Sequence, residues 1–505
     1  MHNKSPCMKN TELSVVEQRK YAFWGALASL AVNTIVPFAG FITSVYLIRV
    51  LGADQYGLYA LVTIVIIWTE TAIAAMTTPA TIKLISEHDS FERTGSLAFQ
   101  IHLGLALVST LVINLIAPRL ADFLQEAMVT LLLRLFSIEV FLFCLSHVYY
   151  TALTGLEKYH RRAAVRAVRW ISRVILIVIF VEAGWAIWGA ILGNITSVLL
   201  ELISGRINIK IPLKLKATHL PIKPYFIWSM PAFLFDISHE IGYKLDLLVL
   251  KSAGASLQQA SYYAAAQNLA YFPNYIVGAT WLFFFSTLLR FIKKGEKKKA
   301  DSLVTAIYKI WLVLLPVCAI ISANAEDICM MVYGAAFRSS GTFLSILVFN
   351  SVFIILLKFS AAIFMAHNRP WWAGLSLMPL LPLLFIAISI LVPRYGPLAA
   401  AWATFAAFAI ASTVNACGLI KRLQIKIPCK PFVLNLMLAI CAYWLMIHIK
   451  PRGWYVLVEI SVVLLLIIGF YVKSGILDKN TALFLQNQFR QLRSFRSKSK
   501  TDRFD

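Results

Sequence analysis

The sequence predicts an all-α polytopic membrane protein of about 14 transmembrane helices, and this prediction rests on composition and on the length of the apolar runs. The chain has 505 residues, of which 59% are apolar and only 14% are charged, and its mean hydropathy is +0.74. About a quarter of the residues of a soluble globular protein are charged. The composition therefore excludes a soluble enzyme and a disordered scaffold.

Long apolar runs fill almost the whole chain. Each approaches the ~20 residues that a helix needs to cross a ~30 Å hydrocarbon layer, and none alternates like the ~10-residue strands of a membrane barrel. We expect helices near 22–48, 57–80, 97–118, 129–153, 165–182, 186–205, 225–249, 260–286, 303–324, 342–366, 373–393, 397–418, 431–449 and 454–472. The connectors on the predicted outer side are short, so we place the function inside the bilayer.

Positive charges alternate between the connectors as the positive-inside rule requires. The amino end, the tail and every second connector carry 36 of the 47 Lys and Arg residues, the other connectors carry 7, and 4 fall inside runs. Arg166, Arg169 and Arg173, at the start of the run 165–182, are counted with the connector before it. We therefore place both termini in the cytoplasm. We interpret the net charge of +23 as a signal of membrane orientation and not of nucleic-acid binding.

The sequence gives no sign of a metal site or of nucleotide hydrolysis. Its seven cysteines are scattered without a C-x-x-C pair, so they predict neither a disulfide framework nor a zinc site. His239-Glu240 begins like a zincin helix, but Tyr243 stands where the second histidine belongs, and no P-loop occurs. We predict no cofactor, no metal and no enzymatic chemistry.

A motif at the end of the first run recurs at the end of the seventh. It reads LIRVLGA at 47–53 and VLKSAGA at 249–255, so Arg49 and Lys251 each precede a glycine by three residues. Because transporters are commonly built from repeated bundles, we expect two pseudo-symmetric six-helix lobes around a central cavity. They cover 1–210 and 211–430, followed by a helix pair at 431–473 and a basic cytoplasmic tail at 474–505.

Further short motifs follow in order along the chain. They are RVLG at 49–52 with YGLY at 56–59, DLL at 246–248 with Gly254 and YA at 263–264, YG at 333–334, and VPRYG at 392–396. Together they resemble the polysaccharide-transporter branch of the MOP (multidrug, oligosaccharidyl-lipid, polysaccharide) exporter superfamily, the Wzx-like O-antigen flippases. The resemblance implies alternating access in the bacterial inner membrane. It also implies transport of undecaprenyl-pyrophosphate-linked oligosaccharides from the cytoplasmic to the periplasmic leaflet, as in lipopolysaccharide biosynthesis.

A stripe of ionisable residues lies in the middle of the seventh run. Asp236, Glu240 and Lys244 are spaced i, i+4, i+8 on one helix face, with His239 beside them. Ionisable groups in a bilayer are costly, so they indicate a wet cavity or a charged partner. We predict that Asp236 and Glu240, with Glu70 near the middle of the second run, couple transport to a proton or sodium ion. A purely structural Glu240–Lys244 pair is the alternative.

Basic residues inside other runs are candidates to meet the pyrophosphate. Lys358 lies roughly 12 Å inside the tenth run at 1.5 Å per residue, and we assign it to the substrate cavity with Arg134, Lys244 and His239. Pairing of Lys358 with a buried carboxylate, and snorkelling of Arg134 to the membrane surface, are the alternatives.

Two prolines occupy corresponding places in the proposed repeats, Pro37 in the first run and Pro231 in the seventh. A proline inside a helix frees carbonyls and permits bending. We predict hinges there, with a static kink as the alternative.

Two other functions fit part of these observations. A MATE-like cation or drug antiporter also needs membrane-embedded acids, and a membrane glycosyltransferase or polysaccharide polymerase would act on the same lipid-linked sugars. The expected partners are the lipid-linked oligosaccharide, the coupling ion, anionic inner-leaflet lipids around the basic tail, and a polymerase or other export proteins.

Overall fold

The computed structural model describes residues 15–88, 90–212, 223–375, 377–425, 429–449 and 455–473. The described residues form helices and connecting turns, with no strand among them. The elements are α1 (Val15–Ser86), α2 (Phe91–Leu124), α3 (Met128–Gly155), α4 (Tyr159–Phe180), η1 (Val181–Trp185), α5 (Ala186–Asn208), α6 (Lys223–Ser252), α7 (Leu257–Ala270), α8 (Phe272–Lys293), α9 (Lys297–Leu312), α10 (Leu314–Ala323), α11 (Ala325–Tyr333), η2 (Ala335–Phe337), α12 (Ser340–Leu347), α13 (Asn350–Ala366), α14 (Pro370–Gly374), α15 (Leu380–Tyr395), α16 (Leu398–Leu423), α17 (Cys429–Ile449) and α18 (Tyr455–Lys473).

The predicted fold class is confirmed, with 14 long helices following the apolar runs in chain order. Eight continuous helical segments of the described chain are long and apolar enough to cross a membrane. Two of these segments hold two spans each, Ile35–Ser86 with 52 residues and Tyr159–Asn208 with 50. Gly52, with φ of 73°, divides the first segment, and Gly184, with φ of 90°, divides the second. Glycine adopts positive φ without the steric cost that a Cβ brings.

Several runs that the sequence predicts as single helices consist of two. The run at 260–286 divides at Tyr271 into α7 and α8, and Pro273 stands in the first turn of α8. Proline has no N–H to donate and is tolerated in a first turn, so a new helix starts here at little cost. The runs at 303–324 and 342–366 divide in the same way, at Val313 and at 348–349.

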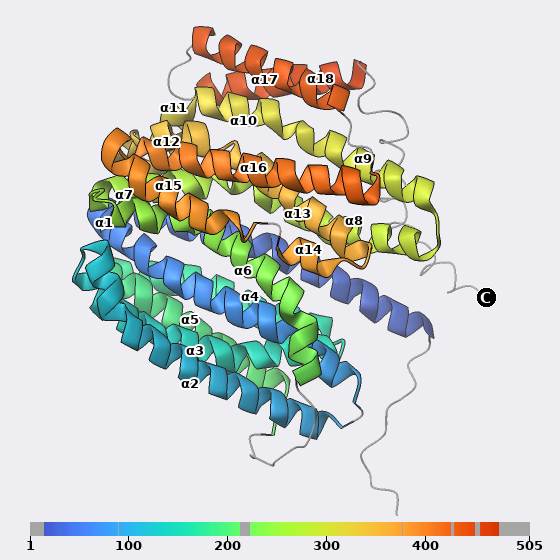
Figure 1. Ribbon diagram of the computed structural model, residues 1–505. Helices are drawn as coiled ribbons and strands as arrows, with labels where there is room; N and C mark the ends of the chain where they lie inside the picture. The colour runs from blue at the N-terminus through green and yellow to red at the C-terminus, as the bar shows by residue number, and fades with distance from the viewer. Residues whose placement is uncertain are drawn as a thin grey trace, which may run out of the picture.

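The helices form two bundles joined along α1 (Figure 1). Helices α2–α5 pack with α1, and helices α6–α16 form the second bundle beside them. α1 contacts α3 and α4 on one side, and α6, α7 and α8 on the other. One large apolar cluster contains buried residues of both bundles, such as Leu132 and Leu250, so the bundles pack directly against each other there.

The last two helices lie at the edge of the second bundle, beyond α10 (Figure 1). Their apolar side chains meet α10 in one cluster that includes Ile320, Met446 and Ile467. Elsewhere, α2 exposes Leu107, Leu111 and Leu115, each more than half accessible and one turn apart. A stripe of this kind is expected where the solvent is lipid rather than water.

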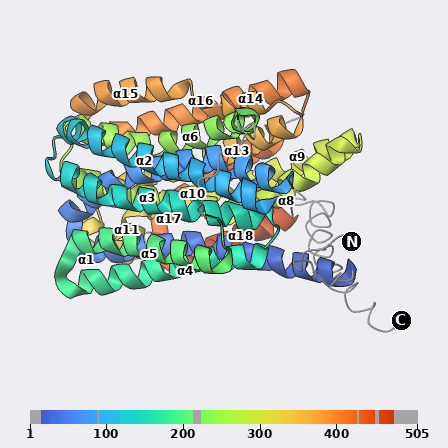
Figure 2. The ribbon, with the colours of Figure 1, turned by 90° about the horizontal axis from the view of Figure 1, so that it is seen from below.

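The ends of the described chain define two ends of the molecule. α1 begins and α18 ends at the same end of the bundle (Figure 2). We call the opposite end the distal end; it holds the turns at 51–53, 125–127, 181–186, 253–256, 334–339 and 396–397. The predicted tail at 474–505, with its lipid contacts, lies outside the described residues. The predicted lobe boundary at 210/211 falls just after α5, ahead of residues 213–222, which also lie outside them.

Candidate functional site

A cavity of about 220 Å³ lies between the two bundles. Its described walls come from both arms of α1, from α4, and from α6 and α7. Arg173 of α4 and Lys244 of α6 line it from the two bundles, while no Asp or Glu is among the described residues of its lining. The cavity therefore receives positive charge from both sides.

Uncharged polar groups complete one wall of this cavity. The side-chain amide of Asn268 on α7 donates to Ser44 Oγ at 2.8 Å and to Tyr56 Oη at 2.7 Å. Ser44 and Tyr56 stand on opposite sides of the Gly52 break, so Asn268 ties the two arms of α1 to the second bundle. The wall carries hydroxyl and amide groups suited to a hydroxylated ligand.

The Lys244 ammonium is held in the wall by neutral groups. Its Nζ donates to Gln267 Oε1 at 3.4 Å and lies 4.8 Å from the centre of the Tyr243 ring. Glu240, one turn away on α6, is not its hydrogen-bond partner. Glu240 and Asp246 interact with this ammonium electrostatically but not through a hydrogen bond, so donors of Lys244 remain for an anion in the cavity.

Lys358 on α13 faces the stripe of α6 that holds Asp236, Glu240 and Lys244; both helices belong to the second bundle. Its Nζ donates to Tyr271 Oη at 3.0 Å, and it interacts electrostatically with Asp236, His239 and Glu240. His239 is buried, whereas Asp236 is exposed although α6 packs between α1 and α15. An exposed carboxylate on an inner helix indicates that this part of α6 borders an opening.

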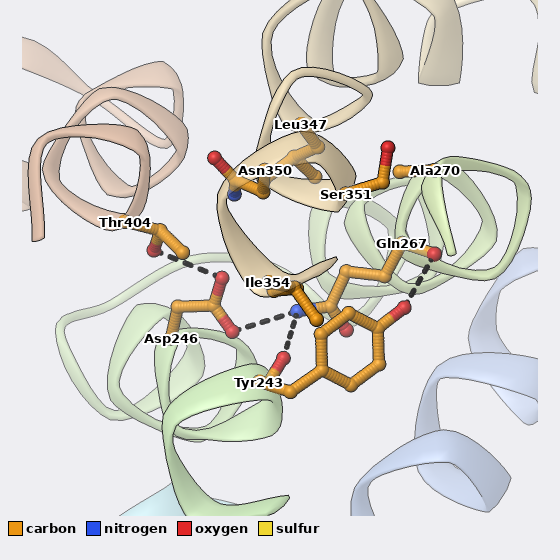
Figure 3. A pocket seen from close by; sticks show the side chains of 9 residues that line it. All are labelled: Tyr243, Asp246, Gln267, Ala270, Leu347, Asn350, Ser351, Ile354 and Thr404. Atoms are coloured by element: carbon orange, nitrogen blue, oxygen red, sulfur yellow. Dashed lines mark hydrogen bonds between the residues drawn. The ribbon is translucent and has the colours of Figure 1, made fainter. Parts of the chain in front are cut away.

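Asp246, two residues beyond Lys244, is fully buried among donors from three helices (Figure 3). Tyr263 Oη donates to its carboxylate at 2.5 Å, Gln267 Nε2 at 2.6 Å and Thr404 Oγ1 at 3.0 Å. The backbone N–H of Leu247 donates to it as well, at 2.9 Å. These bonds fix α6 to α7 and α16 close to Lys244, whose side chain lines the cavity.

A buried ionic cluster lies in the first bundle, around Arg169 of α4. Its Nη2 is 2.8 Å from Glu70 Oε1 and 3.3 Å from Glu139 Oε1, and its Nη1 is 3.6 Å from Glu201 Oε2. Arg166 adds a second contact to Glu201 at 3.6 Å. One guanidinium thus holds carboxylates from α1, α3 and α5, and Glu139 Oε2 has no hydrogen-bond partner among the described residues.

The same face of α4 connects this cluster to the cavity. Arg166, Arg169 and Arg173 are spaced i, i+3, i+7, so they follow one stripe of the helix. Arg173 stacks on Trp170 at 5.0 Å from the ring, and both residues line the cavity. Arg173 also interacts electrostatically with Glu139, so the cavity and the cluster share one electrostatic environment.

The structure brings five of the nine predicted site residues into one group. Asp236, His239, Glu240 and Lys358 gather around α6 and α13, next to Lys244 in the cavity wall. The other members lie apart. Glu70 pairs with Arg169, and Arg134 is exposed on the same face of α3 as Leu131 and Ile138. Pro37 and Pro231 both lie inside helices, in α1 and α6.

Sequence reasoning missed the ionic stripe of α4. It counted Arg166, Arg169 and Arg173 with a cytoplasmic connector, but α4 begins at Tyr159, so Arg169 lies about 15 Å along the helix at 1.5 Å per residue. Their i, i+3, i+7 spacing is a helical signal that could have placed them on one face. The Arg169 partners Glu139 and Glu201 belong to other helices. Residue spacing within one run cannot show which residues of other helices lie close to it.

A family model described as "Polysaccharide biosynthesis protein" (Polysacc_synt_3) matches residues 46–341, more than half of the chain. The chain belongs to this family. The matched region includes the ionic cluster of α4, the stripe of α6 and the cavity lining from Leu47 onward, but not Gly40, Thr43 and Ser44. No curated protein resembles the sequence closely enough to count as a match.

Solved structures with the same fold are transporters of the MOP superfamily, so the predicted resemblance is confirmed. The lipid II flippase MurJ in an inward closed conformation has a TM-score of 0.70 at 16% identity, over 90% of this chain and 98% of MurJ. An inward-facing multidrug resistance MATE transporter has a TM-score of 0.64 at 15% identity, over 82% of this chain and 98% of that transporter. A MOP superfamily transporter from Pyrococcus furiosus has a TM-score of 0.58 at 15% identity, over 85% of this chain and 99% of that transporter. At these identities the likeness concerns the fold.

Proposed function

We propose that this polysaccharide biosynthesis family member is a flippase for a lipid-linked oligosaccharide. It would carry an undecaprenyl-pyrophosphate-linked repeat unit, such as an O-antigen unit, from the cytoplasmic to the periplasmic leaflet of the bacterial inner membrane. Family membership supports the glycan pathway, and the fold shared with the flippase MurJ supports a lipid-linked cargo.

The observation that carries this proposal is the charge of the cavity between the bundles. A pyrophosphate is an anion that Arg and Lys recognise through charge-assisted hydrogen bonds. Arg173 and Lys244 face the cavity from opposite bundles, and the Asn268 wall offers hydrogen bonds to sugar hydroxyls. The cavity is small beside a whole oligosaccharide, so we assign it to the pyrophosphate and the adjoining sugar.

The charge of the cavity also weighs against the antiporter alternative. A cation antiporter needs acids where its substrate binds, and the described acids of α6 lie outside the lining of the cavity. The acids fit better as an ion-coupling group beside the passage. We propose that Asp236 and Glu240, near Lys358, bind a proton or sodium ion during transport, and that Glu70 contributes through its contact with Arg169.

Replacing the cavity cations tests the proposal. Arg173→Gln and Lys244→Gln should each reduce surface polysaccharide strongly in cells whose chromosomal copy is deleted. Lipid-linked oligosaccharide should then accumulate in the inner leaflet, where an impermeant sugar label cannot reach it from outside. The loss follows from the removal of one of two charges that face the pyrophosphate.

Controls separate charge from packing. Arg173→Lys keeps the charge and should retain more export than Arg173→Gln, and Arg134→Gln on the exposed face of α3 should leave export unchanged. In the same assay, Asp236→Asn or Glu240→Gln should trap the lipid-linked sugar if these acids couple transport. Normal surface polysaccharide in a well-expressed Arg173→Gln/Lys244→Gln double variant would contradict the proposed site.

A further inference from the structure

The two basic residues of the repeated motif occupy matching positions at the distal end. Arg49 precedes the break that separates the first two spans, and Lys251 precedes the turn between α6 and α7. Each is the last basic residue of the first span of its half of the chain. Neither lines the cavity between the bundles, so the binding of substrate does not account for them.

Lys251 crosses from the second bundle to the first. Its Nζ lies 3.1 Å from Glu126 Oε1, and Glu126 stands in the turn between α2 and α3. The Lys251 side chain is only 6% accessible, so this ammonium is removed from solvent by its contact. A buried lysine that loses its carboxylate must be hydrated again or stay unpaired at a high cost.

Arg49 crosses in the opposite direction. Its Nε donates to the carbonyl oxygen of Val332 at 2.8 Å, and its Nη2 donates to that of Met331 at 2.8 Å. Both carbonyls belong to the last turn of α11, where backbone acceptors lack helical partners. Arg49 therefore completes the end of a helix in the other bundle.

The two contacts are equivalent under the proposed repeat. The turn between α2 and α3 joins the third and fourth spans of the first half. The segment with α11 and η2 joins the third and fourth spans of the second half, which are α9–α10 and α12–α13. Each basic residue thus reaches from the first span of its own half to the same connector of the other half. A chance pair of surface contacts would not repeat this geometry.

We propose that Arg49 and Lys251 form a distal gate, two clamps that hold the bundles together and close the cavity on the distal side. This inference rests on the proposed transport function, because a gate has meaning only for a chain that opens alternately to two sides. Opening the distal end requires both clamps to break together, since they bind the same two bundles in opposite directions.

Thiol labelling tests the gate without any substrate. Ala60 lines the cavity, and a cysteine placed there in a cysteine-free chain reports access from the distal side. With an impermeant reagent added to vesicles from the distal side, Lys251→Gln and Arg49→Gln should each raise the labelling rate several-fold. The double variant should raise it further.

Two controls keep the outcome specific. Arg338 pairs with Glu326 at 3.1 Å at the same end, but both residues belong to the second bundle, so Arg338→Gln should leave labelling unchanged. The exchange Lys251→Glu with Glu126→Lys should restore slow labelling, which a merely unfolded protein would not show.

The results also separate the gate from the proposed function. Unchanged labelling in the Arg49→Gln/Lys251→Gln double variant would overturn the gate, and so would equal labelling by the charge exchange and by Lys251→Gln. Neither result bears on glycan export, which complementation measures separately. Conversely, faster labelling of the clamp variants in a chain that exports no glycan would leave the gate standing and refute the flippase.

Discussion

Arg169 is the residue on which the first bundle depends most directly. Its guanidinium is almost completely buried, and it contacts acidic side chains from α1, α3 and α5. Removing one partner of a buried ionic group leaves the others uncompensated, which costs about 3–5 kcal/mol. We therefore expect Arg169→Gln to lower the free energy of unfolding by about this amount. The midpoint of denaturant unfolding in detergent should fall with it.

The matched control is Arg134→Gln. Arg134 is exposed on the apolar face of α3, so its replacement should move the unfolding midpoint little. An Arg169→Gln protein as stable as the Arg134→Gln protein would show that the cluster is hydrated in solution and does not hold the bundle together.

Residue-scale prediction from the sequence succeeded where one helix holds the whole pattern. The spacing of Asp236, Glu240 and Lys244 places them on one face of α6, as it must in any α-helix. It could not show that Lys244 donates to Gln267 or that Lys358 faces the stripe, because those partners depend on how separate helices pack. The roles of these residues in binding and coupling stay predictions.

At the scale of the helices, apolar run length was sufficient to find the spans, whereas backbone breaks fixed their ends. Gly52 has φ of 73° and meets no atom within 4 Å of an added Cβ. Its ψ of 179° places it in a backbone region that is essentially restricted to glycine, so the cost of Gly52→Ala is conformational, about 1–3 kcal/mol. We expect this variant to unfold earlier than the parent protein in a denaturant titration.

Gly104 in the interior of α2 supplies the matched comparison. It too meets no atom within 4 Å of an added Cβ, but its backbone is helical. Gly104→Ala should therefore stabilise the protein by about 0.5–1 kcal/mol. If both variants shifted stability in the same direction, backbone strain at Gly52 would not be the cause.

The divisions within predicted spans were not foreseeable from hydropathy. Polar residues do stand beside two of the breaks, Asn268 before Tyr271 and Asn350 after 348–349, but similar residues also occur inside unbroken helices, such as Asn114 in α2. Pro273 was a visible signal, but a proline also occurs inside α6 at Pro231 without dividing the helix. Whether Pro37 and Pro231 act as hinges depends on motion and stays a prediction.

At the scale of the molecule, the repeat at 47–53 and 249–255 predicts two similar lobes, and this relation stays a prediction. The structure uses both copies at the distal end, where each sends a basic side chain across to the other bundle. The sequence could not reveal Glu126 or the α11 carbonyls as partners, because they lie far along the chain from Lys251 and Arg49.

The orientation of the whole molecule is the remaining prediction from charge. The basic connectors that the structure describes lie at the end where α1 begins, so the positive-inside rule predicts that this end is cytoplasmic and the distal end periplasmic. Lys298, in α9, and Arg338, between η2 and α12, are exposed at opposite ends. In a cysteine-free chain, Arg338→Cys should react with an impermeant thiol reagent outside intact spheroplasts.

Lys298→Cys should react only after the membrane is permeabilised, and the cysteine-free parent should not react under either condition. The opposite labelling pattern would show that the protein has the opposite orientation in the membrane. Arg49 and Lys251 would then close the cytoplasmic side, and the cations of the cavity would receive their substrate from the periplasm. The labelling pattern therefore fixes the direction in which both the proposed flippase and its gate operate.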